Sequence, residues 1–584
     1  MNKSTLTQPF ELERLRSDFP LISASPDCYL DNAATTQKPR CVLEAMDTYY
    51  RHNNANVHRA AHRLSRIATD AFEGARQTVQ QFLNAAHADE IIWTRGTTEG
   101  INLVAYSFGQ LAIGAGDEII ISTLEHHANI VPWQLLTQRS GATLRVVPLT
   151  DEGDLDQAAY SALLSSRTKL VALCHVSNAL GTVNPIATMI QQAHAVGAKV
   201  LIDGAQAVSH FRVDVQALDC DFYLFSGHKL YGPTGIGVLY GKQTLLQAMP
   251  PWQAGGEMIE RVSFETTTFQ PPPFRFEAGT PNIAGAIGIA AAIEYLQSFD
   301  LSQRQAHEQA LLQHAVQRLS ALPGLHIIGR PQHRVGLLPF VVEHIHNFDL
   351  GTLLDQHGIA LRTGHHCTMP LHQHLGLEGT VRASFGLYNR LDEIDRLADT
   401  LSELLQQHRL AAQQSPAQQS PAQQPAAGNS RQGTTQAKPP LESAGQHLTK
   451  PLTKPLTQQL LQLDHWQARY SLLMKTAQAQ PCLTELRQDQ HLLHGCSSKV
   501  WLDYRYDSDT NCLHYQLDSD TRIIKGIGIL LLERFSGKTA QQVLDQDLHP
   551  LFQRLALEQH LSASRTNGLH AIITEIKAIA SRYA

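Results

Sequence analysis

The chain has 584 residues, of which 43% are hydrophobic and 17% are charged, and its formal net charge is −6. This length predicts about four domain-sized units, and this composition is ordinary for a protein that folds. Because the 47 Lys and Arg residues do not outnumber the 53 Asp and Glu residues, the basic excess typical of nucleic-acid or anionic-lipid binding is absent. We therefore expect small-molecule or protein partners and no nucleic acid binding.

The sequence also predicts the compartment. No apolar run approaches the roughly 18 residues needed to cross a bilayer, and the segment MNKSTLTQPFELERLRSDF is charged where a signal peptide is apolar. Eight cysteines are too few for a disulfide framework in a chain of this length. We expect a cytoplasmic protein without a membrane segment, whose cysteines are thiols. Four of them lie in or beside apolar segments and are expected to be buried: Cys28, Cys41, Cys174 and Cys220.

Short β-branched strands alternate with amphipathic helical stretches in the first part of the chain. The strands are expected at 90–93, 118–121, 170–176, 199–202 and 222–225. Such alternation predicts a parallel, doubly wound α/β sheet, whose ligand crevice lies beyond the carboxyl ends of the strands. Polar residues follow these strands: Asn178, Asp203, Ser226, His228 and Lys229.

Two segments near these strands suggest a bound phosphate and a bound ring. RGTTEGIN, residues 95–102, lies between the first strand and a predicted helix. Because N–H groups at a helix N-terminus bind anions, Thr97 and Thr98 are candidates for holding a phosphate, with a capping role as the alternative for one of them. In TLEHHANIVPW, His126 or His127 could stack on a ring. Adjacent histidines also raise a zinc interpretation, but neither HExxH nor paired CxxC spacing accompanies them, so no metal site is predicted.

An aspartate and a lysine at neighbouring strand ends point to pyridoxal phosphate chemistry. In VLIDGAQAV and FSGHKLYG, Asp203 could pair with a protonated pyridine nitrogen and Lys229 could form a Schiff base. Each motif alone is weak, because a carboxylate after a strand is more often a cap and a lysine is usually solvated. Gln206 could reach the phenolic oxygen of the ring, while Ser226 and His228 could donate to the phosphate.

Cys367 lies in a loop rich in glycine and histidine, residues 362–370. Pro370 suits the first turn of a following helix, and two histidines together with that helix N-terminus would lower the pKa of the thiol. From the residues alone, a catalytic thiol and an incidental loop cysteine both stay open.

A change of composition divides the chain. From 411 to 458 the sequence is rich in Gln, Ala, Pro, Ser and Thr and contains the repeats SPAQQSPAQQPAAG and LTKPLTKPLT, so we expect a flexible linker. It separates a first domain, 1–410, from a second domain, 459–584. The second domain is expected to be α+β, with helices at 460–480, 522–535 and 567–579 and strands at 499–506 and 512–517. Its Cys496 lies in a tight turn before the first of these strands, where a buried or incidental thiol is the alternative to a functional one.

Collinear motifs of the first domain point to one family. They are YLDNAATT, NVHRAAHRLS, RGTTEGINLVA, EHHANIVPWQ, HVSNALGTVNPI, IDGAQAVSH, FSGHKLYGPTGIGVLYG, GGEMI, FEAGTPN and LRTGHHCTMP. Through them, residues 19–406 resemble SufS/CsdA-type cysteine desulfurases, pyridoxal phosphate enzymes of the class V aminotransferase fold. The resemblance implies fold-type I, a parallel-rich doubly wound sheet with a smaller α/β domain, in a homodimer with active sites at the subunit interface. It also implies L-cysteine as substrate and pyridoxal 5′-phosphate as cofactor.

The resemblance further implies roles for individual residues. Lys229 would be the Schiff-base lysine and Cys367 the thiol that takes the sulfur. Around the cofactor it implies Asp203 at the pyridine nitrogen, Gln206 at the ring oxygen, His126 stacked on the ring, Thr98, Ser226 and His228 at the phosphate, and Thr280 at the phosphate of the neighbouring subunit. Around the substrate we expect Asn178, Arg362 and Arg382, with His58 at the entrance.

The second domain resembles SufE/CsdE sulfur acceptors through HGCSSKVW, SDTRIIKGI, SGKTAQQVL and LSASRTNGL. This implies that a persulfide on Cys367 passes to Cys496 and then to a downstream sulfur acceptor or Fe–S scaffold protein. Ser497 stands where the family often has Gln or Glu. Two alternatives stay open: a selenocysteine lyase, and a C-terminal domain that only binds or activates the desulfurase. The final destination of the sulfur also stays open among Fe–S clusters, molybdenum cofactor and thiolated tRNA.

Overall fold

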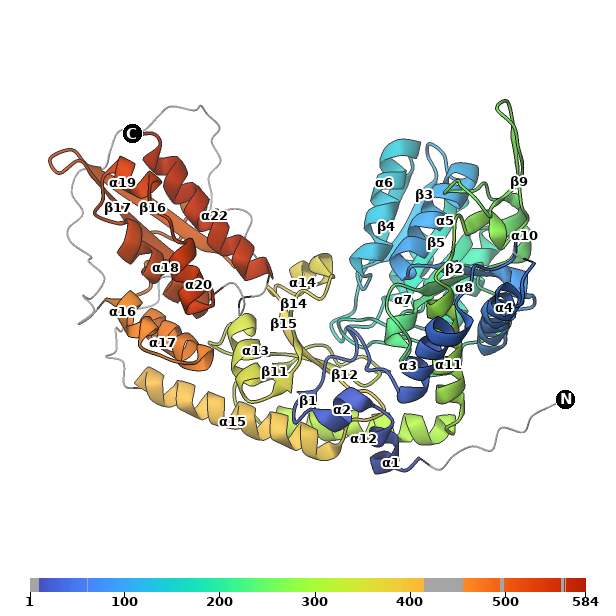
Figure 1. Cartoon of the computed structure of the whole chain (residues 1–584), viewed down its shortest axis with the longest axis horizontal. Coiled ribbons are helices and arrows are strands. Elements are labelled where there is room, and N and C mark those ends of the chain that lie inside the picture. The colour runs from blue at the N-terminus through green and yellow to red at the C-terminus, as the bar shows by residue number, and fades with distance from the viewer. Residues whose placement is uncertain (1–9, 60, 414–454, 494–497, 558–560, 562) are drawn as a thin grey trace. The chain divides into compact units, whose positions relative to one another are not determined.

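The structure is a computed structural model that describes residues 10–59, 61–413, 455–493, 498–557, 561 and 563–584 (Figure 1). The chain divides into two compact units, Met1–Gln406 and Gln407–Ala584. Within the described residues, no helix is both long enough and apolar enough to cross a membrane.

The first unit is built around a seven-stranded mixed sheet with the order β2-β8-β7-β6-β5-β3-β4. Strands β3 to β7 pair in parallel, whereas β8 runs antiparallel to both of its neighbours. The predicted parallel-rich sheet is confirmed, but a purely parallel sheet is wrong, because the segment 227–236 that leads into β8 is too short for the crossover that a parallel strand needs. The strands are β2 (Ile91–Thr94), β3 (Glu118–Ser122), β4 (Thr143–Val147), β5 (Thr168–Cys174), β6 (Lys199–Asp203), β7 (Phe222–Ser226) and β8 (Gly237–Gly241).

Helices cover both faces of this sheet. Residues of α5 and α6 form a core with one face, and residues of α4, α8 and α11 form a core with the other. The helices of this part are α1 (Leu12–Ser17), α2 (Pro20–Ala24), α3 (Arg40–Thr48), α4 (Arg63–Leu83), α5 (Thr97–Ala112), α6 (Val131–Ser140), α7 (Gln157–Leu163), α8 (Ile186–Ala195), α9 (Val215–Leu218), α10 (Gln243–Ala248) and α11 (Ile283–Gln297), and β9 (Ile259–Val262) pairs with β10 (Thr267–Phe269).

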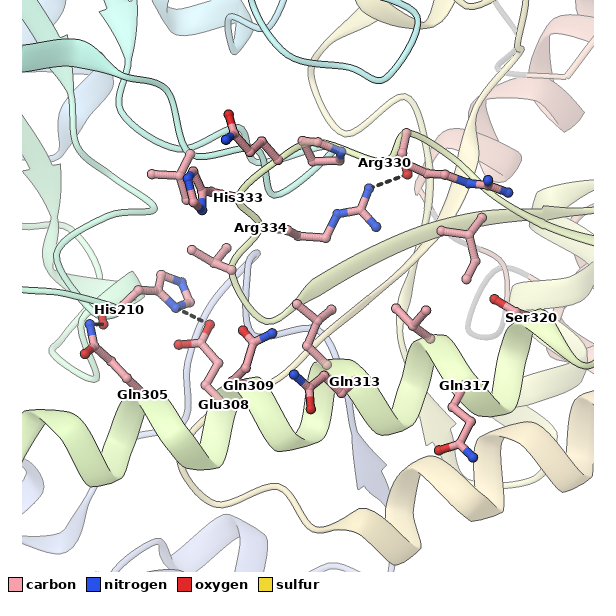
Figure 2. Close-up of a pocket in the computed structure, with 18 of the residues that line it drawn as sticks. His210, Gln305, Glu308, Gln309, Gln313, Gln317, Ser320, Arg330, His333 and Arg334 are labelled. Atoms are coloured by element: carbon pink, nitrogen blue, oxygen red, sulfur yellow. Dashed lines mark hydrogen bonds and ion pairs between the residues drawn. The ribbon is translucent and has the colours of Figure 1, made fainter. Parts of the chain in front are cut away.

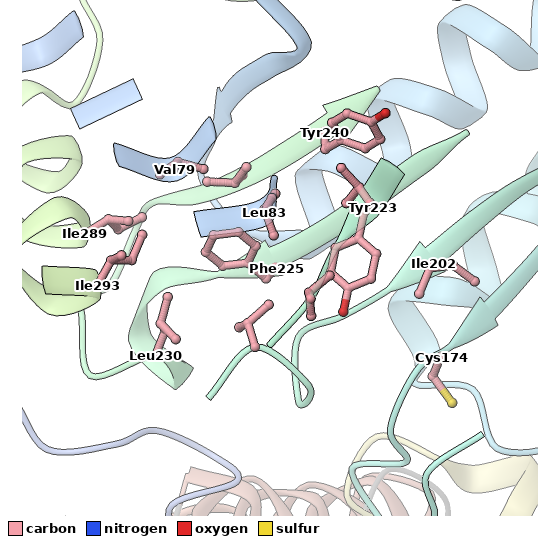
Figure 3. Close-up of a cluster of buried hydrophobic side chains, with 14 of the residues drawn as sticks. Val79, Leu83, Cys174, Ile202, Tyr223, Phe225, Leu230, Tyr240, Ile289 and Ile293 are labelled. Carbon is pink, nitrogen blue, oxygen red and sulfur yellow. The ribbon is translucent and has the colours of Figure 1, made fainter. Parts of the chain in front are cut away.

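Side chains of each strand alternate between the two cores. On β7, Phe222 and Leu224 belong to the core that contains α5 and α6. Tyr223 and Phe225 point the other way, into the cluster shown in Figure 3 with Ile289 and other residues of α4 and α11. Burial on both faces explains why these strands are apolar runs in the sequence. Because both faces of the sheet are buried, polar side chains can come together only at the ends of the strands.

A smaller antiparallel sheet with the order β11-β12-β15-β14 completes the first unit. Residues of α12, α13 and α15 pack against it in a separate core. Pairing of β14 with β15 sets Arg362 opposite Arg382. The elements are α12 (Leu301–Ser320), β11 (Leu325–Ile327), β12 (Leu337–Val342), α13 (Asn347–Gln356), β13 (Ile359–Ala360), which pairs with β1 (Cys28–Tyr29), β14 (Arg362–Gly364), α14 (Met369–His374), β15 (Thr380–Ser384) and α15 (Leu391–Gln413).

The second unit is α+β, as expected from the sequence. A hairpin of β16 and β17 packs with α18 and α22 around one core. The hairpin and α18 match the predicted ranges closely. The elements are α16 (Leu456–Leu461), α17 (Trp466–Ala479), β16 (Val500–Asp507), β17 (Cys512–Ser519), α18 (Arg522–Phe535), α19 (Ala540–Leu544), α20 (His549–Leu555) and α22 (Ala563–Ala580).

The single helix expected at 460–480 is wrong, because the structure has two helices there, α16 and α17. The Nε–H group of Arg469 lies 3.3 Å from Leu460 O and 3.0 Å from Leu463 O. A side chain that donates to carbonyls at the end of α16 satisfies groups that a continued helix would otherwise use. This contact lies at the break between the two helices, and helical periodicity does not reveal it.

Both ends of the predicted linker, 411–458, are helical. Helix α15 continues to Gln413, and α16 begins at Leu456. Leu456 is fully buried in the core of the second unit, and its N–H group donates to Glu533 Oε2 over 2.7 Å. A glutamate at a helix N-terminus satisfies an N–H group that has no partner within the helix. Residues 414–454 lie outside the described part of the chain.

Candidate active site

A cavity of about 200 Å³ opens where β5, β6 and β7 end. This is the expected position for a ligand site in a sheet whose central strands are parallel. Most of the predicted site residues line the cavity, although they come from both sheets and several loops. They are Thr97, Thr98, His126, Asn178, Asp203, Gln206, Ser226, His228, Lys229, Arg362, Cys367 and Arg382.

Asp203 and Lys229 face this cavity from adjacent strand ends. Asp203 is the last residue of β6 and is 5% exposed, while Lys229 ends the short helix that follows β7. Burial lowers the pKa of Lys229 to about 8, although the nearby Asp203 opposes this shift. Burial also raises the pKa of Asp203, against the effect of Lys229. Each charge is therefore costly where it lies, and a partner of opposite charge would stabilise it.

The Asp203 carboxylate has capacity for a further donor. The hydrogen bond that the structure gives it comes from the Ala205 N–H group to Oδ1, over 2.9 Å. The turn after β6 carries this amide and also Gln206, whose Nε2 donates to Ala33 O over 2.7 Å. The turn begins at Gly204, where an added Cβ would lie 2.1 Å from the ring of Tyr223, so a larger residue does not fit.

The start of α5 forms an anion-binding end of the cavity. The Thr97 N–H group donates to Ser226 Oγ over 3.0 Å, and the two hydroxyl oxygens are 2.9 Å apart. This close approach depends on Gly237 of β8, because an added Cβ there would lie 2.6 Å from the Gly96 Cα atom. The N–H groups of a first helical turn have no acceptor within the helix, so hydroxyls and amides converge here on a site suited to phosphate.

Two histidines of the cavity are held neutral. Burial, helped by the nearby Lys229, lowers the pKa of His126 to about 3 and that of His228 to about 4. His126 Nδ1 accepts a hydrogen bond of 3.1 Å from the Ala128 N–H group, which orients the ring. A neutral ring is suited to stacking and to hydrogen bonding without adding positive charge beside a lysine.

Cys367 is half-buried in a loop that other parts of the chain hold in place. His366 and Cys367 both adopt left-handed backbone conformations, with φ of 49° and 58°, which are uncommon for residues other than glycine. Cys367 O accepts a hydrogen bond of 2.8 Å from His127 N, and the Cys367 N–H group donates to His365 Nδ1 over 3.1 Å. Asn178 Nδ2 donates to His366 O over 2.8 Å. These contacts fix the thiol at the edge of the cavity.

Helix α14 begins directly after the cysteine loop. Pro370 lies in its first turn, as the sequence predicts. The Met369 N–H group donates to His127 Nε2 over 3.0 Å, so one histidine side chain caps the start of this helix. The second histidine of TLEHHANIVPW is thus bound to the cysteine loop, whereas His126 lines the cavity.

Arg382 is the most deeply buried cation of the cavity lining. It is 2% exposed, and it donates to Asn178 O over 2.6 Å and to Asp31 Oδ1 over 3.2 Å. Its Nε–H group has no acceptor among the described residues. Burial lowers its pKa to about 10, with Asp31 opposing. Arg362 is more exposed and lies 3.9 Å from the other oxygen of Asp31. The pair can therefore receive a carboxylate.

Two predicted residues lie elsewhere in the first unit. His58 forms an ion pair of 2.9 Å with Glu73 and packs its ring against Phe274. Thr280 is exposed and lines a different cavity, beside Arg95. Neither lines the cavity described above, so their roles stay predictions. Cys496 lies outside the described residues.

Sequence reasoning missed two acids of this region. Asp31, within the quoted motif YLDNAATT, engages both arginines. Glu125 directly precedes His126 and is fully buried, so its pKa is raised to about 7. It accepts a hydrogen bond of 2.7 Å from Asn129 Nδ2. An acidic residue three positions after an apolar strand, directly before the two histidines, is the available signal for Glu125.

The four cysteines expected to be buried do not all behave alike. Cys28, Cys174 and Cys220 are buried, as expected, but Cys41 is exposed on α3. Cys174 also lines the cavity, at the end of β5.

Residues 28–397 match the protein family described as aminotransferase class-V, and residues 454–580 match the family described as Fe-S metabolism associated domain. Cysteine desulfurase of Dickeya dadantii is 54% identical over 406 residues, covering 69% of this chain and 98% of that protein. Cysteine desulfurase of Synechococcus elongatus is 52% identical over 399 residues, covering 68% of this chain and 64% of that protein.

Solved structures share the fold of the first unit. Cysteine desulfurase CsdA of Escherichia coli, with an S-sulfonic acid, superposes with a TM-score of 0.65 at 44% identity, covering 68% of this chain and 100% of that chain. A C-DES mutant with glycine covalently linked to its PLP cofactor gives a TM-score of 0.58 at 25% identity, covering 66% of this chain and 99% of that chain. The first unit therefore has the fold-type I architecture that the motifs imply.

Proposed function

The chain belongs to the aminotransferase class-V family and is a cysteine desulfurase that uses pyridoxal 5′-phosphate, and from this premise we propose which residues carry its reaction. The observation that carries the proposal is that Lys229, Asp203, Cys367 and Arg382 line one cavity. The reaction removes sulfur from L-cysteine, releases L-alanine and leaves the sulfur on an enzyme thiol as a persulfide.

The cavity fits the cofactor. Its buried carboxylate, its lysine, its neutral histidine ring and its helix N-terminus match a protonated pyridine nitrogen, an aldehyde carbon, a ring face and a phosphate. When bound, the cofactor supplies an electron sink for the electron pair released at the substrate Cα. The proposed contacts are Lys229 at the aldehyde carbon, Asp203 at the pyridine nitrogen, Gln206 at the ring oxygen, His126 on the ring face, and Thr97, Thr98, Ser226 and His228 at the phosphate.

Lys229 is proposed to accept the proton of the substrate Cα and to return a proton to that carbon. Its lowered pKa of about 8 supports this role, because such an amine takes up and returns a proton readily near neutral pH. A cationic ring nitrogen of the bound cofactor would stabilise the charge of Asp203. Lys229 would thus act on the proton at the substrate Cα, and Asp203 on the charge of the cofactor ring.

Arg382 and Asn178 are proposed to hold the substrate carboxylate, with Arg362 beside them. The Arg382 Nε–H group that lacks an acceptor among the described residues supports this role. Charge-assisted hydrogen bonds from a guanidinium group fix both the position and the orientation of a carboxylate. Holding the carboxylate aligns the Cα–H bond for removal of its proton.

Cys367 is proposed to attack the substrate sulfur as a thiolate. A bond forms between the two sulfur atoms as the bond between the substrate Cβ and its sulfur breaks. The electron pair of the broken bond stays on carbon, which takes up a proton on the way to alanine. Substrate sulfur is left as the outer atom of a persulfide on Cys367.

The persulfide is proposed to pass to Cys496 of the second unit by thiol attack on its outer sulfur. The match of residues 454–580 to the Fe-S metabolism associated domain supports this relay, and it also supports a downstream Fe–S scaffold or other sulfur acceptor. A tether between the two units would raise the local concentration of the acceptor thiol to the order of millimolar. We place the reaction in the cytosol, where the thiols would remain reduced.

A homodimer is part of the proposal. Thr280 is exposed and lies outside the cavity of its own chain, so a phosphate contact from it requires a second copy. Light scattering of the purified protein tests this, and a monomer at micromolar concentration would contradict it.

The assignment as a whole is tested by mass spectrometry of the intact protein after addition of L-cysteine. Peptide mapping should locate an added sulfur atom on Cys367, with one alanine released for each sulfur transferred. Incubation with L-selenocysteine in parallel separates a desulfurase from a selenocysteine lyase.

Replacing Arg382 by alanine should lower kcat/KM for L-cysteine by roughly 10- to 100-fold. This corresponds to about 1.5–3 kcal/mol for hydrogen bonds to a charged group. Most of the effect should be in KM, and alanine formation at increasing substrate concentration measures it. Arg139→Ala is a matched control, because Arg139 is exposed on α6 away from the cavity. An unchanged KM in Arg382→Ala would contradict the assigned contact.

A further inference from the structure

Three neighbouring spaces of the first unit, one of them the active-site cavity, share wall residues. A groove of about 1100 Å³ lies between α12, β11 and the loop 329–335 (Figure 2). A small cavity of about 30 Å³ lies between this groove and the active site. His210 and Glu308 line both the groove and the small cavity. Ala33, Gln206 and Lys229 line both the small cavity and the active site.

One turn of backbone carries side chains to all three spaces. After β6, residues 204–210 form a turn in which the His210 N–H group donates to Ala207 O over 2.9 Å. Gln206, Ser209 and His210 all belong to this turn. Gln206 reaches the active site, Ser209 lines the small cavity, and His210 reaches the groove.

A histidine and a carboxylate in close contact lie where the small cavity and the groove share wall residues. His210 Nδ1 lies 2.6 Å from a Glu308 oxygen, and Figure 2 shows the ring directed at the carboxylate. The two side chains are only 16% and 20% exposed. Glu308 also accepts a hydrogen bond from the Gly336 N–H group. Other titratable groups that act on Glu308 or lie under its influence are Arg304, His307 and Tyr231.

The small cavity is suited to water. A water molecule needs roughly 10–15 Å³ of such space together with polar partners, so one or two molecules fit. Polar and charged residues of its wall include Ser209, Glu308 and Lys229. Water hydrogen-bonded between such groups can pass protons along the chain of hydrogen bonds.

We propose that this small cavity, with the His210–Glu308 pair at its outer end, is the route by which Lys229 exchanges protons with solvent. It reaches Lys229 without passing Cys367, Arg362 or Arg382, which line the active-site cavity and not the small one. The inference rests on the proposed role of Lys229 as the proton carrier. The route keeps that exchange open while substrate fills the active site.

The proton balance shows what the route does. The Cα proton leaves to Lys229 Nζ and a proton returns to that carbon, while one thiol proton is released and one proton is added at Cβ. No proton is consumed in total, and no oxidant or reductant is needed. An open route lets the proton held by Lys229 exchange with solvent before it is returned, whereas a blocked route favours return of the same proton.

The test uses the full-length holoenzyme and L-cysteine deuterated at Cα, in ordinary water. The Ser209→Val variant fills the small cavity, and the fraction of deuterium retained in alanine should rise several-fold over that of the wild type. Ser209→Ala removes the hydroxyl without filling the space and serves as the size control, and its retention should rise less than that of Ser209→Val. The visible absorbance of the bound cofactor and the melting temperature show that each variant is folded and loaded.

A second variant tests the outer end of the route. Glu308→Gln keeps the shape of the side chain but removes its charge, and deuterium retention should rise in it as well. A crystal structure of the wild-type holoenzyme should show ordered water in the small cavity. Unchanged retention in folded, loaded Ser209→Val protein would overturn the route, and unchanged retention in Glu308→Gln would remove the His210–Glu308 pair from it. Failure of the Lys229 assignment is distinguishable, because Lys229→Ala would then remain active.

Discussion

Alanine at position 229 should abolish the visible absorbance of the covalently bound cofactor and reduce alanine formation from L-cysteine by at least about 10³-fold. Proton transfer by a positioned group alone contributes about 10²–10⁴-fold, and this substitution removes both the amine that binds the cofactor and the proposed proton carrier. Borohydride treatment of the wild type should fix the cofactor on the peptide that contains Lys229.

Lys169→Ala is a matched control for this variant. Lys169 lies on β5, is 40% exposed and is absent from the cavity lining. It should retain both the absorbance and the activity. Full activity in Lys229→Ala would contradict the assignment of the whole site.

Asp203→Ala should keep some cofactor but lose roughly 10²–10³-fold in turnover or more, the effect of removing one electrostatic contact to developing charge. The carboxylate is buried and lies beside Lys229, so its loss removes the counter-charge for a protonated ring nitrogen. Asp203→Asn keeps the shape of the side chain but removes its charge. Its turnover should be as low as that of Asp203→Ala. Near-normal turnover in Asp203→Asn would show that the charge is not used.

Another large effect is expected from the order in which Cys367 and Cys496 receive sulfur. Supplied with L-cysteine, Cys367→Ala should carry no persulfide on Cys496, because the first acceptor is missing. Cys496→Ala should charge Cys367 once and then stall, and a mild reductant that strips the persulfide should restore its turnover. Mass spectrometry of peptides locates the sulfur, and alanine released in the first turnover measures the burst.

Two outcomes of this experiment discriminate between the open interpretations of the second unit. Persulfide on Cys496 of the Cys367→Ala protein at the wild-type rate would show that the relay is wrong. Normal turnover of Cys496→Ala without reductant, combined with slow turnover of a chain that lacks 455–584, would instead identify the second unit as a binding or activating module. Cys512→Ala is a control, because Cys512 lies at the start of β17 and has no proposed role.

The candidate site could be predicted in part because some of its members are local. Asp203 and Lys229 each follow an apolar strand within a short motif, and parallel strands bring such ends to the same edge of a sheet. Arg382 was named through resemblance alone, and its contacts with Asp31 and Asn178 join residues 351 and 204 positions apart. No periodicity or spacing reports contacts over that distance.

The second unit also contains features that local sequence predicts and features that depend on distant contacts. The hairpin of β16 and β17 was predicted well, because alternation of polar and apolar residues reflects one buried face. The break between α16 and α17 was missed, because helical periodicity does not reveal that the Arg469 side chain reaches back to carbonyls of the preceding helix. The helical start at Leu456 was missed for a related reason, since Glu533 from α18 satisfies its amide.

By itself, the sequence determined the class of the sheet, the strand ends that carry Asp203 and Lys229, and the two families that the chain resembles, because these depend on neighbouring residues. Only the tertiary structure decided that β8 is antiparallel, that His58 and Thr280 lie outside the cavity, and that Asn178 holds the loop of Cys367 from 188 residues away. The small cavity behind Lys229 belongs to this second group. Its walls come from distant segments that meet only when both sheets have packed together, and a space between side chains has no signature in any one of them.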